Sequence, residues 1–144
     1  YTYDKTALTE LNPLFVTPNV AVPPPPLGTP LPGTPKSSAA LSIEYGHVAM
    51  AGGDWRFAAN AHYQSSLLPA LSLTAPTVPG YTMVDARVTY ARSHWLATLY
   101  VDNIGNVLGI TSYSDPAIYG NRYQAVVSRP RTVGATFGYS FKGW

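Results

Sequence analysis

The sequence lacks cysteine and carries few charges, and both absences narrow the classes of protein it can encode. None of the 144 residues is a cysteine, which excludes disulfide frameworks, thiol catalysis and cysteine-based zinc sites. Only 11% of the residues are charged, against about a quarter in an ordinary soluble domain. The formal net charge of +2 is too weak and too dispersed to predict nucleic-acid binding.

Long apolar runs are also missing, and the first residues do not resemble a signal peptide. No run approaches the roughly 20 apolar residues of a transmembrane helix, which excludes a helical membrane protein. The first residues have neither the basic start nor the apolar core of a signal peptide, so we expect the natural N-terminus to lie upstream. Tyrosine is abundant by contrast, with 11 residues whose amphipathic rings suit a membrane–water interface.

The most informative segment runs from Thr132 to Phe141. Its odd-numbered positions are apolar or aromatic, and its even-numbered positions are small or polar. Because successive side chains of a strand point to opposite faces, this pattern predicts a strand with one wholly apolar face. A soluble sheet buries such a face under a helix or a second sheet, whereas an outer-membrane barrel turns it toward lipid and lines a wet lumen with the polar face.

Five further segments share the same period of two. The N-terminal segment has the weakest pattern, and the last of the five is ambiguous because both of its faces carry large apolar groups. The predicted strands occupy residues 1–11, 38–50, 55–65, 82–91 and 95–103.

The connections between these segments alternate in length. Two are short, AGGD and ARSH, and three are long and hold most of the prolines: 12–37, 67–81 and 105–130. Short periplasmic turns and long outer loops are typical of outer-membrane barrels. We therefore expect the C-terminus and both short turns in the periplasm and the long loops outside the cell. The first long loop favours polyproline II, as an extended outer loop or as a stiff spacer.

Four segments resemble the late barrel strands of TonB-dependent outer-membrane receptors: LPGTPKSSAALSIEY, YTMVDARVTYA, LYVDNIGN and SRPRTVGATFGYSF. They follow the family's order and cover most of the chain from Leu31 onward. The resemblance implies an all-β fold, an antiparallel transmembrane β-barrel segment of about six C-terminal strands from a barrel of roughly 22. The chain departs from the family in adding Lys142, Gly143 and Trp144 after Phe141, the position at which members usually end.

The resemblance also implies a function and partners. Members import scarce solutes such as siderophores, cobalamin or oligosaccharides across the outer membrane of Gram-negative bacteria. The sequence holds no counterpart of the family's plug domain, so residues 1–144 are expected to form the C-terminal part of a receptor barrel. The remaining strands and the plug, on the same or a separate chain, are the expected partners, together with outer-membrane lipid and a TonB complex that acts through the plug. No cofactor is expected.

Other functions remain compatible with alternating strands. A passive porin or a surface adhesin barrel shows the same pattern without a plug, and a soluble β-sandwich binding module also has an apolar face on every strand. An enzyme is not expected, because no serine, histidine and carboxylate are arranged for nucleophilic catalysis.

Several charged or polar side chains fall on the predicted polar faces of the strands. As a group they are candidates either for contacts to substrate or for a structural lattice that holds the barrel wall to the plug. No second histidine lies at metal-ligand spacing from the histidine among them, so no metal site is predicted. The lumen-facing candidates are Glu44, Arg56, His62, Asp85 and Arg87.

The last long loop holds the best candidates for binding a ligand. Its tyrosines offer stacking faces, and its charged residues offer hydrogen-bonding groups suited to sugars or iron chelates. An aromatic belt at the membrane interface explains the same tyrosines without a ligand. The candidate substrate-binding residues are Tyr113, Asp115, Tyr119, Arg122 and Tyr123.

Overall fold

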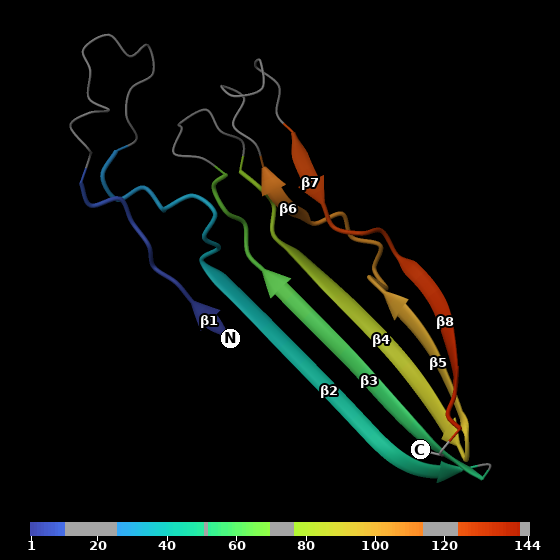
Figure 1. The fold of residues 1–144 in the computed structure, drawn as a ribbon. Helices are drawn as coiled ribbons and strands as arrows, with labels where there is room; N and C mark the ends of the chain where they lie inside the picture. Colours follow the sequence, from blue (N-terminus) through green and yellow to red (C-terminus); the bar gives the residue numbers. More distant parts are fainter. Residues whose placement is uncertain (11–25, 51, 70–76, 114–123, 142–144) are drawn as a thin grey trace. The chain divides into compact units, whose positions relative to one another are not determined.

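The fold is all-β. A computed structural model describes residues 1–10, 26–50, 52–69, 77–113 and 124–141, and within them every regular element is a strand. Six strands form one open sheet in the order β1-β2-β3-β4-β5-β8, and two form a separate ribbon (Figure 1). The strands are β1 (Thr2–Tyr3), β2 (Ser37–Met50), β3 (Gly53–Gln64), β4 (Tyr81–Arg92), β5 (Trp95–Asp102), β6 (Ile110–Tyr113), β7 (Ala125–Val127) and β8 (Thr132–Tyr139).

The strands confirm the predicted pattern except at the N-terminus. A strand was expected over residues 1–11, but β1 covers only Thr2–Tyr3 and pairs with the start of β2. Further along, the backbone of Leu8 exchanges hydrogen bonds with Gly28 and Thr29. The segment that follows Thr29 contains three prolines, which lack the N–H donors that a regular ladder needs. The pairing is therefore irregular.

Contacts divide the chain into two compact units. The first, here called the wall unit, comprises Ala40–Tyr63, Thr82–Leu108 and Arg129–Trp144. The second, the connection unit, comprises Tyr1–Ala39, Gln64–Tyr81 and Gly109–Ser128. Strands β2, β3 and β4 each contribute residues to both units.

Both short turns of the wall unit lie at one end of its sheet. Arg92 pairs with Trp95, which leaves a turn of two residues whose first, Ser93, has a φ of +50°, as hairpin turns require. A Cβ placed on Gly52, in the other short turn, would lie 3.5 Å from the guanidinium carbon of Arg92. The backbone N–H of Ser140 donates to the carbonyl of His94 over 2.8 Å, so β8 also ends there. Both short turns and the end of β8 therefore lie together, as the lengths of the connections predicted.

The register of β4, β5 and β8 sorts the side chains by face. In the middle of these strands, an apolar row across the sheet is followed by a row of small polar residues. One such row contains Val88, Leu99 and Ala135, and the next contains Thr89, Thr98 and Thr136. The hydroxyls of Thr89 and Thr98 are 3.0 Å apart, within hydrogen-bonding distance. The period of two in the sequence therefore corresponds to two chemically distinct faces.

The described residues contain almost no hydrophobic core. Val78 is their only buried apolar residue, whereas the side chains of Val133, Phe137 and Leu99 are 72%, 71% and 64% exposed. A β-sandwich would bury these apolar faces between two packed sheets. The open sheet instead leaves them uncovered, which argues against the soluble sandwich.

Candidate functional site

An aromatic cluster lies on the apolar face of the wall unit, near the short turns. The rings of Trp55 and Tyr90 are 4.8 Å apart between neighbouring strands. Trp95 packs against Phe137 at 5.0 Å and against Tyr139 at 4.6 Å, both across the β5–β8 ladder. Girdles of aromatic residues near the ends of the strands are typical of membrane barrels, because aromatic rings suit the boundary between lipid and water.

The opposite face of β5 resolves the ambiguity of that strand. Tyr100 is a large side chain on the polar face, and its partner across the ladder is Gly134. A Cβ on Gly134 would lie 2.8 Å from Cε1 of Tyr100 and closer still to its hydroxyl. Leu96, the other large residue on this face, is paired with Gly138. Glycines on the neighbouring strand thus leave room for the two bulky groups.

Asn103 is the centre of a hydrogen-bond network at the end of β5. Its side chain is 3% exposed, and its φ is +52°, which asparagine tolerates better than most residues. Its amide nitrogen donates to the carbonyls of Val107 and Arg129 over 2.8 and 2.9 Å, and its amide oxygen accepts from the N–H of Val107 over 2.9 Å. Its backbone N–H donates to Oδ1 of Asp85 over 2.7 Å. One side chain therefore fixes the end of β5 to the approach to β8.

The turn after Asn103 extends this network toward β8. The N–H of Asn106 donates to the carbonyl of Asn103 over 2.8 Å and closes the turn. The side-chain oxygen of Asn106 accepts from the N–H of Arg131 over 3.0 Å. Asn103 therefore caps this turn through its side-chain hydrogen bonds to Val107.

The predicted lumen residues do not form one cluster of contacts. Glu44, Arg56, His62 and Arg87 are exposed, and Asp85 is half-buried. The Asp85 carboxylate accepts the hydrogen bond from Asn103, and no ion pair joins it to Arg87. Asp85 therefore helps to fix the end of β5 to β4.

Most of the predicted ligand loop lies outside the described residues, including Asp115, Tyr119, Arg122 and Tyr123. Tyr113 ends β6, where its backbone pairs with Ala125 of β7. Within the described ranges, no group of three or more metal-ligating side chains comes together. The same ranges contain no helix that is long and apolar enough to cross a membrane.

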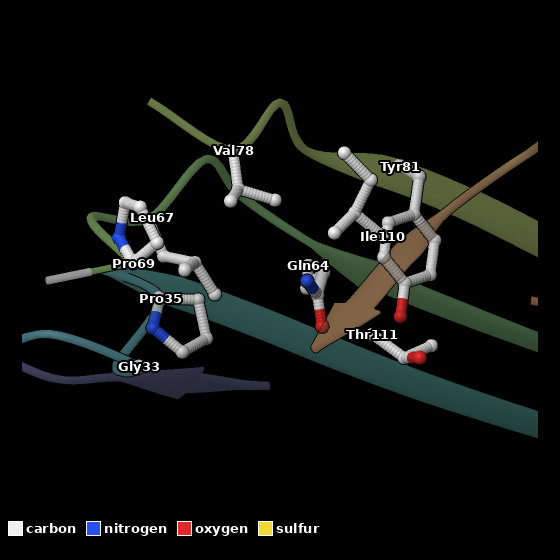
Figure 2. Close-up of a pocket in the computed structure, with 9 residues that line it drawn as sticks. All are labelled: Gly33, Pro35, Gln64, Leu67, Pro69, Val78, Tyr81, Ile110 and Thr111. Atoms are coloured by element: carbon white, nitrogen blue, oxygen red, sulfur yellow. The ribbon is translucent and has the colours of Figure 1, made fainter. Parts of the chain in front are cut away.

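The connection unit holds a pocket that the sequence did not predict. Its volume is about 340 Å³, and it opens where β3 ends and β4 begins. Figure 2 shows Pro35, Leu67 and Pro69 on one side and Tyr81, Ile110 and Thr111 on the other, with Gln64 between them. The remaining lining residues are Gly33 and Val78. Residues 67–81 and 105–130 were expected to form separate loops, and no local sequence pattern indicated that both would line one pocket.

Comparison with known proteins identifies the barrel. The family described as "TonB dependent receptor-like, beta-barrel" matches residues 1–104 of the 144. The chain belongs to this family. Searches among curated proteins and among solved structures found no significant match. Members of the family are transporters of the outer membrane rather than enzymes, and the exposed apolar face of the wall unit has the character of a lipid-facing barrel surface.

Proposed function

We propose that this TonB-dependent receptor barrel takes part in the energy-dependent import of a scarce solute across a bacterial outer membrane. Residues 1–144 supply barrel wall and extracellular loops. The remaining strands and a plug domain, on the same or a separate chain, complete the receptor, and a TonB complex acts through the plug. The C-terminus and the short turns face the periplasm.

The exposed apolar face carries this proposal. It is continuous across β5 and β8, it ends in aromatic residues beside the short turns, and it has no covering layer among the described residues. In water such a face would aggregate, whereas in a bilayer it is solvated by lipid. The match to the receptor family favours active import over a passive porin.

The ligand-binding role of the last long loop stays part of the proposal. Tyr113, Asp115, Tyr119, Arg122 and Tyr123 combine aromatic faces with charged groups of both signs, which suits capture of a polar solute at the outer mouth. We expect the exposed side chains of Arg56, His62 and Arg87 to face the lumen and to contact either the plug or the passing solute.

Uptake assays test the proposed function. Cells that make or lack the full receptor are given a panel of ferric siderophores, cyanocobalamin and neutral disaccharides, each in strains with and without TonB. We expect at least one solute to accumulate only when both the receptor and TonB are present. Accumulation that needs the receptor but not TonB would show a passive pore and contradict the proposal.

A further inference from the structure

The described residues that line the pocket of the connection unit carry no formal charge. None of these nine residues is Asp, Glu, Lys, Arg or His. Its walls are apolar at Pro35, Leu67, Pro69, Val78 and Ile110, and its polar side chains are all neutral. Small-molecule sites usually combine mostly apolar walls with a few placed polar groups in volumes of roughly 300–1,000 Å³. A volume of about 340 Å³ is at the lower end of that range.

The backbone around the pocket is held in place by hydrogen bonds. Leu67 and Val78 exchange two of them, at 3.1 and 2.9 Å, and the N–H of Gly33 donates to the carbonyl of Leu68 over 2.8 Å. A Cβ on Gly109 would lie 2.8 Å from the ring of Tyr81, so this glycine lets the ring pack closely against the β6 end of the pocket. The pocket is therefore preformed, which lowers the entropic cost of binding a ligand.

The polar groups suit a ligand with hydroxyls. The hydroxyl of Thr111 donates to the carbonyl of Val126 over 3.1 Å, so its oxygen can still accept a hydrogen bond. Within the described part of the chain, the side-chain amide of Gln64 makes no hydrogen bond, so it offers both donors and an acceptor. The ring of Tyr81 supplies an aromatic wall beside them (Figure 2).

We propose that this pocket binds an uncharged polyhydroxylated ligand the size of one or two sugar rings, and that the imported solute is of this class. This inference rests on the proposed import function. Sugars combine apolar C–H faces, which pack on aromatic and proline rings, with hydroxyls that both donate and accept. The described lining offers no cation to the charge of an anionic chelate, a costly arrangement in a partly desolvated site.

Binding to the purified full receptor in detergent tests the inference. The probes are maltose, sucrose, cellobiose and lactose, with a ferric catecholate chelate and cyanocobalamin as competitors, measured by calorimetry. Gln64→Met removes the amide at nearly constant volume, and Asn60→Leu is the matched control, because Asn60 lies on the same face of β3 and outside the pocket. Unchanged β-sheet circular dichroism confirms that each variant is folded.

We expect at least one disaccharide to bind. Gln64→Met should weaken its affinity about 10-fold through loss of a hydrogen bond, whereas Asn60→Leu should leave the affinity within about 2-fold of the unsubstituted receptor. Disaccharide binding that is insensitive to Gln64→Met would overturn the inference. So would a folded receptor that binds the ferric chelate or the cobalamin and no disaccharide, although TonB-dependent uptake of that ligand would leave the proposed import function standing. Loss of TonB dependence for every probe would instead contradict the import function.

Discussion

The ring of Tyr100 lies over the backbone of Gly134, its partner across the β5–β8 ladder. The pair places a large aromatic side chain on the polar face of the sheet without disturbing the strands. It also makes the glycine irreplaceable by a larger residue unless the ring moves.

The first prediction concerns this pair. Gly134→Val should force the Tyr100 ring from its position and lower the free energy of unfolding by about 1–3 kcal/mol. Gly46→Ala is the control, because a Cβ there would meet Cγ of Arg56 at an ordinary 3.5 Å. The measurement is urea unfolding of the full receptor in micelles. The double variant Gly134→Val/Tyr100→Ala should lose less stability than the two single variants added together, and simple additivity would argue against the contact.

The second prediction concerns depth in the membrane. Leu99 lies midway along β5, whereas Phe137 belongs to the aromatic cluster near the short turns. Arginine at Leu99 should therefore cost about 2–4 kcal/mol, and arginine at Phe137 should cost less because it lies closer to the interface. Thr136→Arg, on the polar face, should cost least. Equal unfolding free energies for the three variants would mean that the face assignment is wrong.

The third prediction concerns Asn103. Asn103→Ala loses three side-chain hydrogen bonds. It also places alanine at a positive φ, which alanine tolerates less well than asparagine. The variant should therefore lower the stability of the receptor by about 2–4 kcal/mol. Asn103→Gly loses the same hydrogen bonds but tolerates the backbone conformation, and its loss should be smaller by about 1 kcal/mol. Equal losses in denaturant unfolding would show that the conformation of the backbone contributes nothing.

The fourth prediction concerns orientation. Leu27 is 61% exposed in the first long connection, and Ser93 lies in a short turn. On intact cells, an impermeant thiol reagent should label Leu27→Cys and leave Ser93→Cys unlabelled until the outer membrane is broken. The chain has no cysteine of its own to add background. Labelling of Ser93→Cys alone would invert the proposed topology.

The strands of the wall unit could be predicted from the sequence, because the alternation of apolar and polar residues is a local property of each strand. The expected strands 82–91 and 95–103 correspond closely to β4 and β5, and their faces agree with the observed register. The sequence of β5 alone did not show which of its faces is apolar, because both carry large side chains. The space for Tyr100 comes from a glycine on another strand, Gly134, which lies opposite it.

Features made by distant parts of the chain were not predicted. The bridge between Leu67 and Val78 and the β6–β7 ribbon both lie in segments expected to be loops. The pocket gathers Gln64, Tyr81 and Thr111 from three elements, and the hydrogen bonds that position them are mainly between backbone groups. Backbone pairing across irregular segments leaves little trace in side-chain patterns, so only the structure shows it.

The most direct test of the account is the environment of each side chain along β8. Single cysteines carrying spin labels at Thr132, Val133, Ala135, Thr136 and Phe137 in the full receptor, reconstituted in bilayers, report exposure to oxygen and to a water-soluble nickel chelate. The account predicts high oxygen and low nickel accessibility at 133, 135 and 137, and the reverse at 132 and 136, with a period of two. Equal accessibility at neighbouring positions, or high nickel accessibility at Val133 and Phe137, would contradict the conclusion that this face meets lipid.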